Sequence, residues 1–346
     1  MKMTVISAGL GAPHAGWAAV DELAHLLSGY FEAELLTPAG LGAPWWRRVA
    51  GREQARFAPQ ASAGGDVLFV VARGPQDLAV IDSIPQVRRR FGRIHAFVTD
   101  SYFQAGYPRQ TRLYDGITVT ACEDMAFPRQ RFGTAVHHVH QGVDALRWAP
   151  RGERHRDIDV LAYGRTPPSY HACLQQRFHD AASPHLYLHS PLGNLTGPTV
   201  QLERGMLFKL LHHSRIALAF HLFVEPQGQR PRSMMVTSRW LESLLAGCVV
   251  AGKRPVSTMA DDMLGWDGAT VELADAPEDA ADQLRQLLAM DGVLHQQRRR
   301  NVREVLTRHD WRHRIVDLCG HFQLDVPPAL RADQQRVLAL ADQFGP

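Results

Sequence analysis

Short apolar runs alternate with helix-like patterns along the first part of the chain. These runs are nearly continuous, as in strands that are covered on both faces. They fall at 4–8, 66–72, 94–99, 116–121 and 136–140. A helical pattern at 17–27 follows a Gly-rich turn, and the Arg-bearing stretch 47–63 predicts a helix and a loop. Strands that alternate with helices indicate a doubly wound, mostly parallel sheet.

A second α/β series begins after a charged stretch without periodicity at 147–156, which is typical of a linker. Its expected strands are 159–163, 185–189, 215–220, 248–251 and 270–273. The expected helices cover 237–246, most of 277–324 and 331–343. We therefore predict an α/β protein with two Rossmann-like domains, whose parallel sheets face each other across a ligand-binding cleft. The predicted domains are 1–150 and 151–325, followed by a C-terminal helix at 326–346 that packs back toward the first domain.

Composition excludes several classes of protein. The chain has 346 residues, 45% of them apolar, which suits two globular domains. The net charge of +3 does not indicate a nucleic-acid-binding protein. No apolar run reaches the roughly 18 residues that a membrane span needs. The four cysteines form no C-x-x-C pair, and no signal segment is evident, so we expect a cytoplasmic location. His138 and His140 share a strand face without a nearby carboxylate, so no metal site is expected there.

The segment TSRWLESLLAGCVV at 237–250 carries the strongest candidate chemistry. Its apolar residues fall on one helical face, and Gly247 ends the helix in the preferred manner. The start of the helix, at Ser238 and Arg239, offers free N–H groups to a phosphate. Glu242, one turn further, could accept hydrogen bonds from a ribose diol. On the pattern alone, the alternative is an Arg239–Glu242 surface pair on an ordinary amphipathic helix.

Three segments resemble GT-B glycosyltransferases, and in particular the group-1/family-4-like enzymes and their CgeB-like branch. The segment from Arg239 through Glu242 to Val250 resembles R-x-(F/L)-E-x-x-A-x-G-x-x-V. The stretch 141–150 (QGVDALRWAP) resembles the P-x-G-V-D-x-x-x-F-x-P that links the two domains of these enzymes. The stretch 303–316, with His309-Asp310-Trp311, resembles the h-t-W-x-x-R helix where the chain returns to the first domain. The order and spacing of the three motifs make the resemblance specific, whereas the N-terminal half matches only in its strands and Gly-rich turn.

The resemblance implies a glycosyltransferase whose second domain binds a nucleotide-sugar donor, with UDP or GDP as the nucleotide. Glu242 would then bind the ribose, and Ser238 and Arg239 would meet the diphosphate. Gly164 and Arg165 follow the first strand of that domain, where a basic group stabilises the leaving diphosphate. The planar fork of Arg165 suits phosphate oxygens, and the alternative for this residue is an ordinary surface-loop arginine.

The chain also departs from the family pattern. Met234 stands where family-4 enzymes carry a second glutamate, and Glu225 has the wrong spacing to replace it. The family lysine has no evident match, because Lys209 lies on a helix-like segment and Lys253 follows a short strand. These differences leave the donor sugar and the stereochemistry of transfer open.

The first domain would supply the acceptor site and a general base. Asp100, at the end of a strand, and His14, in the first Gly-rich loop, are the candidate bases; for both the alternative is a cap or turn residue. Gly11 and Gly16 would let the backbone approach the diphosphate or the acceptor. Their spacing does not match the G-x-G-x-x-G fingerprint, which argues against an NAD(P) dehydrogenase.

We therefore expect a glycosyltransferase that needs no metal and no cofactor besides its nucleotide-sugar co-substrate. Its acceptor would be a glycan, a lipid-linked or a small molecule, with no nucleic-acid partner and at most a peripheral membrane contact. The alternatives are a nucleotide-sugar epimerase on the same fold and a non-catalytic sugar- or partner-binding module derived from a transferase. A periplasmic-type two-domain receptor is a third, which the lack of a signal segment disfavours.

Overall fold

The computed structural model describes residues 1–8, 15–37, 40–42, 54–56, 64–190, 200–225 and 233–345. The chain divides into two compact units. The first unit contains Met1–Gln141 and Trp311–Ala332, and the second contains Gly142–Leu195, Gln201–Asp310 and Asp333–Pro346. The units therefore divide after Gln141, whereas the sequence suggested a domain boundary at residue 150. Each unit is described below by itself.

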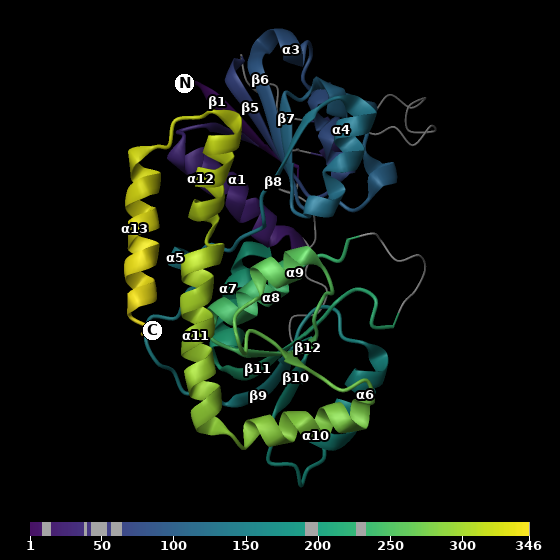
Figure 1. The fold of residues 1–346 in the computed structure, drawn as a ribbon, viewed down its shortest axis with the longest axis vertical. Coiled ribbons are helices and arrows are strands. Elements are labelled where there is room, and N and C mark those ends of the chain that lie inside the picture. The colour runs from purple at the N-terminus through teal and green to yellow at the C-terminus, as the bar shows by residue number, and fades with distance from the viewer. Residues whose placement is uncertain are drawn as a thin grey trace. The chain divides into compact units, whose positions relative to one another are not determined.

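A parallel sheet forms the centre of the first unit (Figure 1). Its strands are β1 (Met3–Ser7), β2 (Glu34–Leu36), β5 (Gly65–Ala72), β6 (Phe91–Val98), β7 (Gly116–Val119) and β8 (Ala135–His138). They lie in the order β2-β1-β5-β6-β7-β8, so the chain leaves β1 toward one side and then continues on the other. A separate antiparallel pair joins β3 (Gly40–Gly42) to β4 (Gln54–Arg56).

Helices cover both faces of this sheet. They are α1 (Ala18–Tyr30), α3 (Val87–Arg90), α4 (Ala126–Phe132), α12 (Trp311–Phe322) and the start of α13 (Pro328–Asp342), with 3-10 turns at Ala15–Trp17, Pro75–Ser83, Gln104–Gly106, Arg109–Leu113 and Cys122–Asp124. The alternation of side chains in β5 separates two cores. Phe69 packs in one core with α1 and α12, and Leu68 packs in the other with the 75–83 turn. Because both faces are buried from Val67 onward, residues 67–72 are apolar throughout, whereas Asp66 at the start of β5 is exposed.

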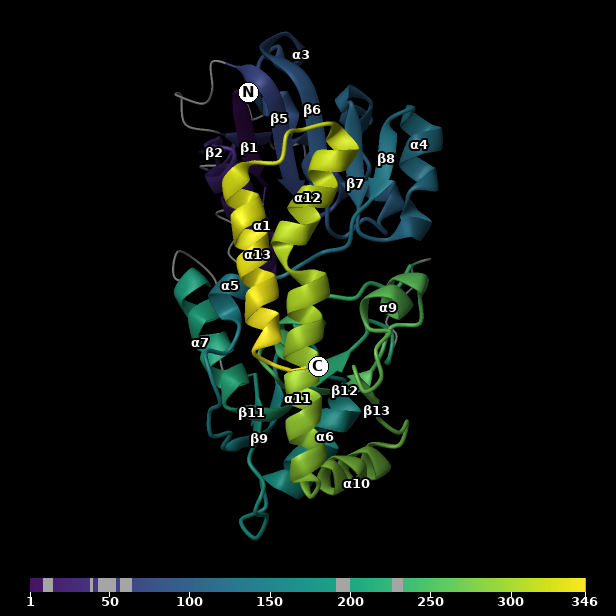
Figure 2. The ribbon, with the colours of Figure 1, turned by 60° about the vertical axis from the view of Figure 1, so that its left-hand side comes forward.

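The second unit contains another parallel sheet. Its strands are β9 (Ile158–Ala162), β10 (Tyr187–His189), β11 (Ser214–Phe220), β12 (Val249–Lys253) and β13 (Val271–Glu272), in the order β10-β9-β11-β12-β13. The surrounding helices are α5 (Ala145–Trp148), α6 (Pro168–Phe178), α7 (Val200–His212), α8 (Ser238–Leu245), α9 (Thr258–Met263), α10 (Pro277–Leu288) and α11 (Asp291–His309). One face packs on α6 and α10, which lie side by side in Figure 2, and α8 packs between the other face and α11.

Two of the three motifs noted in the sequence meet in the second unit. Val143 forms an isolated parallel bridge with Asp310, and its N–H donates to the carbonyl of His309 over 3.0 Å. The N–H of Ala145 donates to Oδ2 of the buried Asp310 over 2.8 Å. The stretch that follows β8 is therefore tied to the end of α11, although the two lie far apart in sequence.

The predicted fold class is confirmed, because both units are α/β and are built on parallel sheets. The prediction of helix and loop at 47–63 is wrong at Gln54–Arg56, which is a strand; the rest of that stretch lies outside the described residues. The predicted linker begins inside α5, which ends at Trp148. None of the helices in the described part of the chain is long and apolar enough to cross a membrane.

Candidate active site

The order of strands in the second unit points to the edge where a ligand would bind. The chain goes from β9 to β10 on one side and then to β11 on the other side of β9. In open parallel sheets, ligands bind outside the carboxyl ends of the strands at such a switch point. The residues that follow β9 are Tyr163, Gly164 and Arg165. The structure therefore places two of the predicted donor-binding residues at the switch point of this sheet.

Gly164 allows the loop after β9 to meet the start of α8. Its φ is +68°, a left-handed conformation that favours glycine. A Cβ at this position would lie 2.4 Å from Nη2 of Arg239. Nη1 of Arg239 donates to the carbonyl of Arg165 over 2.7 Å, and the guanidinium lies 5.6 Å from the centre of the Tyr163 ring. The predicted residues Gly164, Arg165 and Arg239 thus form one cluster.

Glu242 is buried at 3% exposure in the same cluster. Its Oε1 pairs with Nη1 of Arg204 at 2.7 Å, and its Oε2 lies 3.3 Å from the hydroxyl of Tyr163. The alternative of an Arg239–Glu242 surface pair is therefore wrong. Helical periodicity placed Glu242 on the polar face of α8, but Arg204 and Tyr163 cover that face.

Tyr163 connects the cluster through its hydroxyl. The hydroxyl oxygen lies 3.1 Å from the carbonyl of Arg239 and 3.0 Å from Oγ of Ser243. Burial, reinforced by the Glu242 carboxylate, raises the pKa of Tyr163 well above its usual range, so the hydroxyl remains a donor. It holds one proton and can donate either to Glu242 or to the carbonyl of Arg239, while Ser243 can donate to it.

Arg204 holds Glu242 from the side of α7. Its side chain is buried, and its guanidinium lies 5.3 Å from the Phe208 ring and 5.8 Å from the Trp148 ring. These two rings stack at 4.4 Å with an angle of 4° between their planes. The rings therefore fix the guanidinium that orients Glu242. The sequence reasoning missed both Arg204 and Tyr163; the position of Tyr163 directly before Gly164 was a usable signal, whereas Arg204 had none.

Ser238 is the first residue of α8 and is half-buried. Thr237, the N-cap, forms no side-chain hydrogen bond to the helix. The side chain of Arg165 is exposed. The start of α8 and the long, exposed side chain of Arg165 therefore lie beside the switch point. The positive end of the helix dipole favours an anion there.

The structure also shows the surroundings of Glu225, Lys253 and Lys209, the acidic and basic residues that do not fit the family pattern. Glu225, after β11, accepts hydrogen bonds from the N–H of Ser169, over 3.4 Å, and from its hydroxyl at the start of α6. Lys253 pairs with Asp275 at 2.6 Å and with Glu272 at 3.4 Å. Lys209 is exposed on α7. Lys253 is therefore already engaged by two carboxylates.

The candidate residues of the first domain belong to the first unit of the chain. Asp100 lies at a bend after β6, half-buried, and its N–H donates to the carbonyl of Arg73 over 2.7 Å. Gly16 is exposed in the 3-10 turn before α1. His14 and Gly11 lie outside the described residues. Asp100 and Gly16 belong to the first unit, so their roles stay predictions.

Within the described ranges, no group of three or more histidine, cysteine, aspartate or glutamate residues could hold a metal ion. The ring centres of His138 and His140 lie 4.4 Å apart, although β8 ends at His138 and the predicted strand 136–140 is therefore shorter. A metal-free reaction stays a prediction, which the proposed function takes up.

Comparison with solved structures identifies the class of fold. The chain resembles HepE from Anabaena in complex with UDP-glucose, with a TM-score of 0.54 and 10% identity over 93% of this chain and 100% of that one. It also resembles an alpha-glucosyltransferase in complex with UDP, with a TM-score of 0.58 and 8% identity over 92% of this chain and 98% of that one. The protein therefore has the GT-B fold of glycosyltransferases.

A family model adds to this assignment. Residues 176–320 match the family described as glycosyl transferase-like, so this part of the chain is similar to that family. No curated protein sequence matches the chain. The matched range includes Arg204, Arg239 and Glu242, and it begins shortly after Gly164 and Arg165. The more specific placement in the CgeB-like branch stays a prediction.

Proposed function

We propose that this protein is a glycosyltransferase that moves a sugar from a nucleoside-diphosphate sugar to a hydroxyl group of an acceptor. UDP is the favoured nucleotide, because HepE and the alpha-glucosyltransferase, which share the fold, were solved with UDP or UDP-glucose. The observation that carries the proposal is the cluster of Gly164, Arg165, Arg239 and Glu242 at the switch point of the second unit.

Glu242 is the proposed ligand of the ribose. A carboxylate has about four lone-pair sites, and Arg204 and Tyr163 use one on each oxygen. The Tyr163 hydroxyl lies 3.3 Å from Oε2, which is long for an O–H···O bond, and it has the carbonyl of Arg239 as a second acceptor. A ribose hydroxyl can therefore take over Oε2 while Arg204 keeps the carboxylate in place.

The diphosphate is proposed to lie against Arg165, Arg239 and the first N–H groups of α8. Two guanidinium groups and a helix N-terminus supply hydrogen-bond donors and positive charge, which an anion needs. These groups would stabilise the charge that grows on the leaving diphosphate as the glycosidic bond breaks. We propose that these groups suffice and that the reaction needs no metal.

The acceptor is proposed to bind the first unit, with Asp100 or His14 as the base that takes the proton of its hydroxyl. A glycan, a lipid-linked or a small molecule is the proposed acceptor. DNA accompanies UDP in one structure of the alpha-glucosyltransferase. The net charge of +3 does not favour a nucleic-acid partner for this chain. A cytoplasmic location and a peripheral membrane contact stay predictions of the sequence.

Replacing Glu242 by glutamine tests the ribose assignment. We expect calorimetric titration to show that UDP binds the wild-type protein and binds E242Q about 10- to 100-fold more weakly, because hydrogen bonds to a charged group are lost. GDP and ADP titrations establish the nucleotide preference. Glu278→Gln, at an exposed carboxylate on α10, is the matched control and should bind UDP as the wild type does. Equal UDP affinity in folded E242Q would contradict the assignment.

Incubation with a UDP-sugar separates the proposed transferase from its alternatives. A transferase leaves the donor sugar unchanged at every ring carbon when no acceptor is present, apart from slow hydrolysis to UDP and free sugar. An epimerase converts the donor without an acceptor, and a binding module changes nothing. Analysis of the donor by NMR spectroscopy distinguishes these results, and formation of an epimeric nucleotide sugar would overturn the proposal.

A further inference from the structure

A basic pocket lies in the second unit, apart from the cluster around Glu242. It has a volume of about 160 Å³, and its charged lining residues are Glu153, Arg154, Arg156, His295, Arg298 and Arg299. They come from the segment before β9 and from α11, and the pocket is completed by Gly247 and by Phe344 near the C-terminus. Figures 1 and 2 both draw the C-terminus beside α11. We propose that this pocket binds a small oxyanion, which is a phosphate or a carboxylate group.

The pocket lies at the opposite edge of the sheet from the candidate active site. Arg156 lies two residues before β9, and Gly247 lies in the short turn between α8 and β12. These positions mark the amino ends of parallel strands, whereas Gly164 and Arg165 follow the carboxyl end of β9. An anion bound in the pocket would therefore be separate from the proposed diphosphate site.

Most charged groups of the lining already have partners. Arg156 donates to carbonyls at the ends of two helical segments, over 3.2 Å to Leu211 and 2.8 Å to Ala246. Glu153 is an exposed carboxylate that lies 3.7 Å from Arg299 and 3.4 Å from His295. Arg299 also donates to the carbonyl of Gln343 over 3.1 Å. One carboxylate thus faces four arginines and a histidine.

These contacts leave two lining arginines without a hydrogen bond or ion pair among the described residues: Arg154, which is exposed, and Arg298. Arg298 is half-buried. Burial lowers the pKa of Arg298, and Arg156 and Arg215 lower it further because their charges repel it. A partly buried charge without a counter-ion is unfavourable, so an anion at this place would relieve both burial and repulsion.

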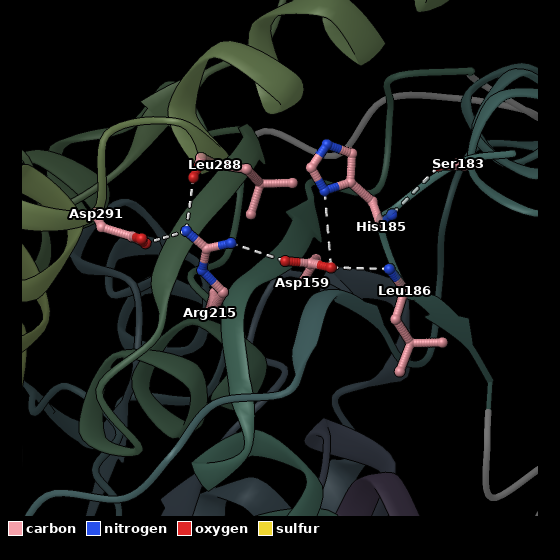
Figure 3. A network of polar contacts seen from close by, with 7 residues as sticks. All are labelled: Asp159, Ser183, His185, Leu186, Arg215, Leu288 and Asp291. Carbon is pink, nitrogen blue, oxygen red and sulfur yellow. Dashed lines mark hydrogen bonds and ion pairs between the residues drawn. The ribbon is translucent and has the colours of Figure 1, made fainter.

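Arg215, whose charge also acts on Arg298, is by contrast paired with carboxylates (Figure 3). Its Nη1 pairs with Asp159 at 2.8 Å, and its Nη2 donates to the carbonyl of Leu288 over 2.6 Å and contacts Asp291. The carboxylate of Asp291 is thus taken up by Arg215. Asp291 also attracts Arg298, but it does not line the pocket, where Glu153 is the one acid beside four arginines and a histidine, so the lining keeps an excess of positive charge.

The pKa of His212 is also affected by arginines of the pocket. Its Nε2 lies 3.0 Å from the carbonyl of Trp148. Burial, together with the charges of Arg156 and Arg154, lowers the pKa of His212 to about 4. The positive potential therefore extends beyond Arg298, which is what attracts an anion into a pocket.

The size of the pocket selects the ligand. At roughly 30 Å³ for each water, 160 Å³ holds about five water molecules, which fits a phosphate or a small carboxylate. Pockets for larger ligands usually measure about 300–1,000 Å³, so the size of this pocket favours a small group. The planar fork of an arginine matches two oxygens of either kind of anion.

Calorimetric titration of inorganic phosphate into the full-length protein tests the proposal, in a buffer whose ionic strength is kept constant with chloride. We expect phosphate to bind Arg298→Gln about tenfold more weakly than it binds the wild type, because a charge-assisted hydrogen bond is removed. Arg300→Gln, two residues further on the same helix and outside the pocket lining, should bind phosphate as the wild type does. A parallel titration with malonate shows whether the pocket prefers carboxylate to phosphate.

The variants also distinguish this pocket from the proposed diphosphate site. Because Arg298 makes no bond in the described structure, R298Q should unfold at the temperature of the wild type or higher. Loss of phosphate binding in Arg165→Gln but not in R298Q would place the anion at the loop after β9 and overturn the proposal. Equal affinity of the wild type and R298Q for both anions, or no binding of either anion to the wild type, would overturn it as well.

Discussion

Replacing Arg204 by methionine will lower the free energy of unfolding by about 3–5 kcal/mol, the usual cost of leaving a buried charge without its partner. Glu242 and Arg204 are paired at 2.7 Å, and their side chains are 4% and 3% exposed. Methionine fills much of the space beside the stacked rings of Trp148 and Phe208 but offers no counter-ion. The Tyr163 hydroxyl would then be the remaining partner of the carboxylate, at 3.3 Å.

Urea denaturation of the wild type, R204M and the double variant R204M/E242Q measures this effect. The double variant removes the orphaned charge, so most of the lost stability should return. Arg336→Met is the matched control, because Arg336 is 71% exposed in its pair with Asp333, and an exposed pair contributes at most about 1 kcal/mol. A loss in R204M no greater than that of R336M would show that the buried pair is not needed to hold the fold.

The same variants separate stability from the proposed function. The double variant lacks the carboxylate that we propose for the ribose, so it should regain stability without regaining UDP affinity. Recovery of both together would mean that Glu242 acts on binding only through the fold.

Most of the fold could be predicted from local patterns, and β5 shows why. Leu68 and Phe69 pack into different cores on opposite faces of the sheet, so the run must be apolar at every position. The strand Gln54–Arg56 has no such run. This strand forms because it pairs with Gly40–Gly42. Such a pairing cannot be recognised from the hydrophobicity of the strand's own residues.

The candidate site was partly predictable for a similar reason. Gly164 follows a strand, and Arg239 begins a helix, so both had to lie near the carboxyl edge of a parallel sheet. The surroundings of Glu242 could not be predicted. Periodicity shows that a residue is polar, but it does not show that Arg204, from another helix, will bury it.

Replacing Arg165 by alanine will reduce the turnover of the proposed transferase about 10²- to 10³-fold, while UDP affinity changes only severalfold. The side chain of Arg165 is exposed beside the switch point, and the one hydrogen bond given for this residue uses its backbone carbonyl, so removal of the side chain should not disturb the cluster. A group that meets charge developing on the leaving diphosphate acts more strongly in the transition state than in the ground state.

The kcat and KM for release of UDP from the UDP-sugar, with water as acceptor where none better is known, measure this change. Arg165→Lys should keep part of the activity, because it retains the charge but loses the planar fork. Arg177→Ala is the matched control, since this arginine pairs with Asp282 at 2.7 Å on the far helix pair α6 and α10. If R165A raised KM or weakened UDP binding by the full factor while kcat stayed the same, Arg165 would bind the donor without promoting its cleavage.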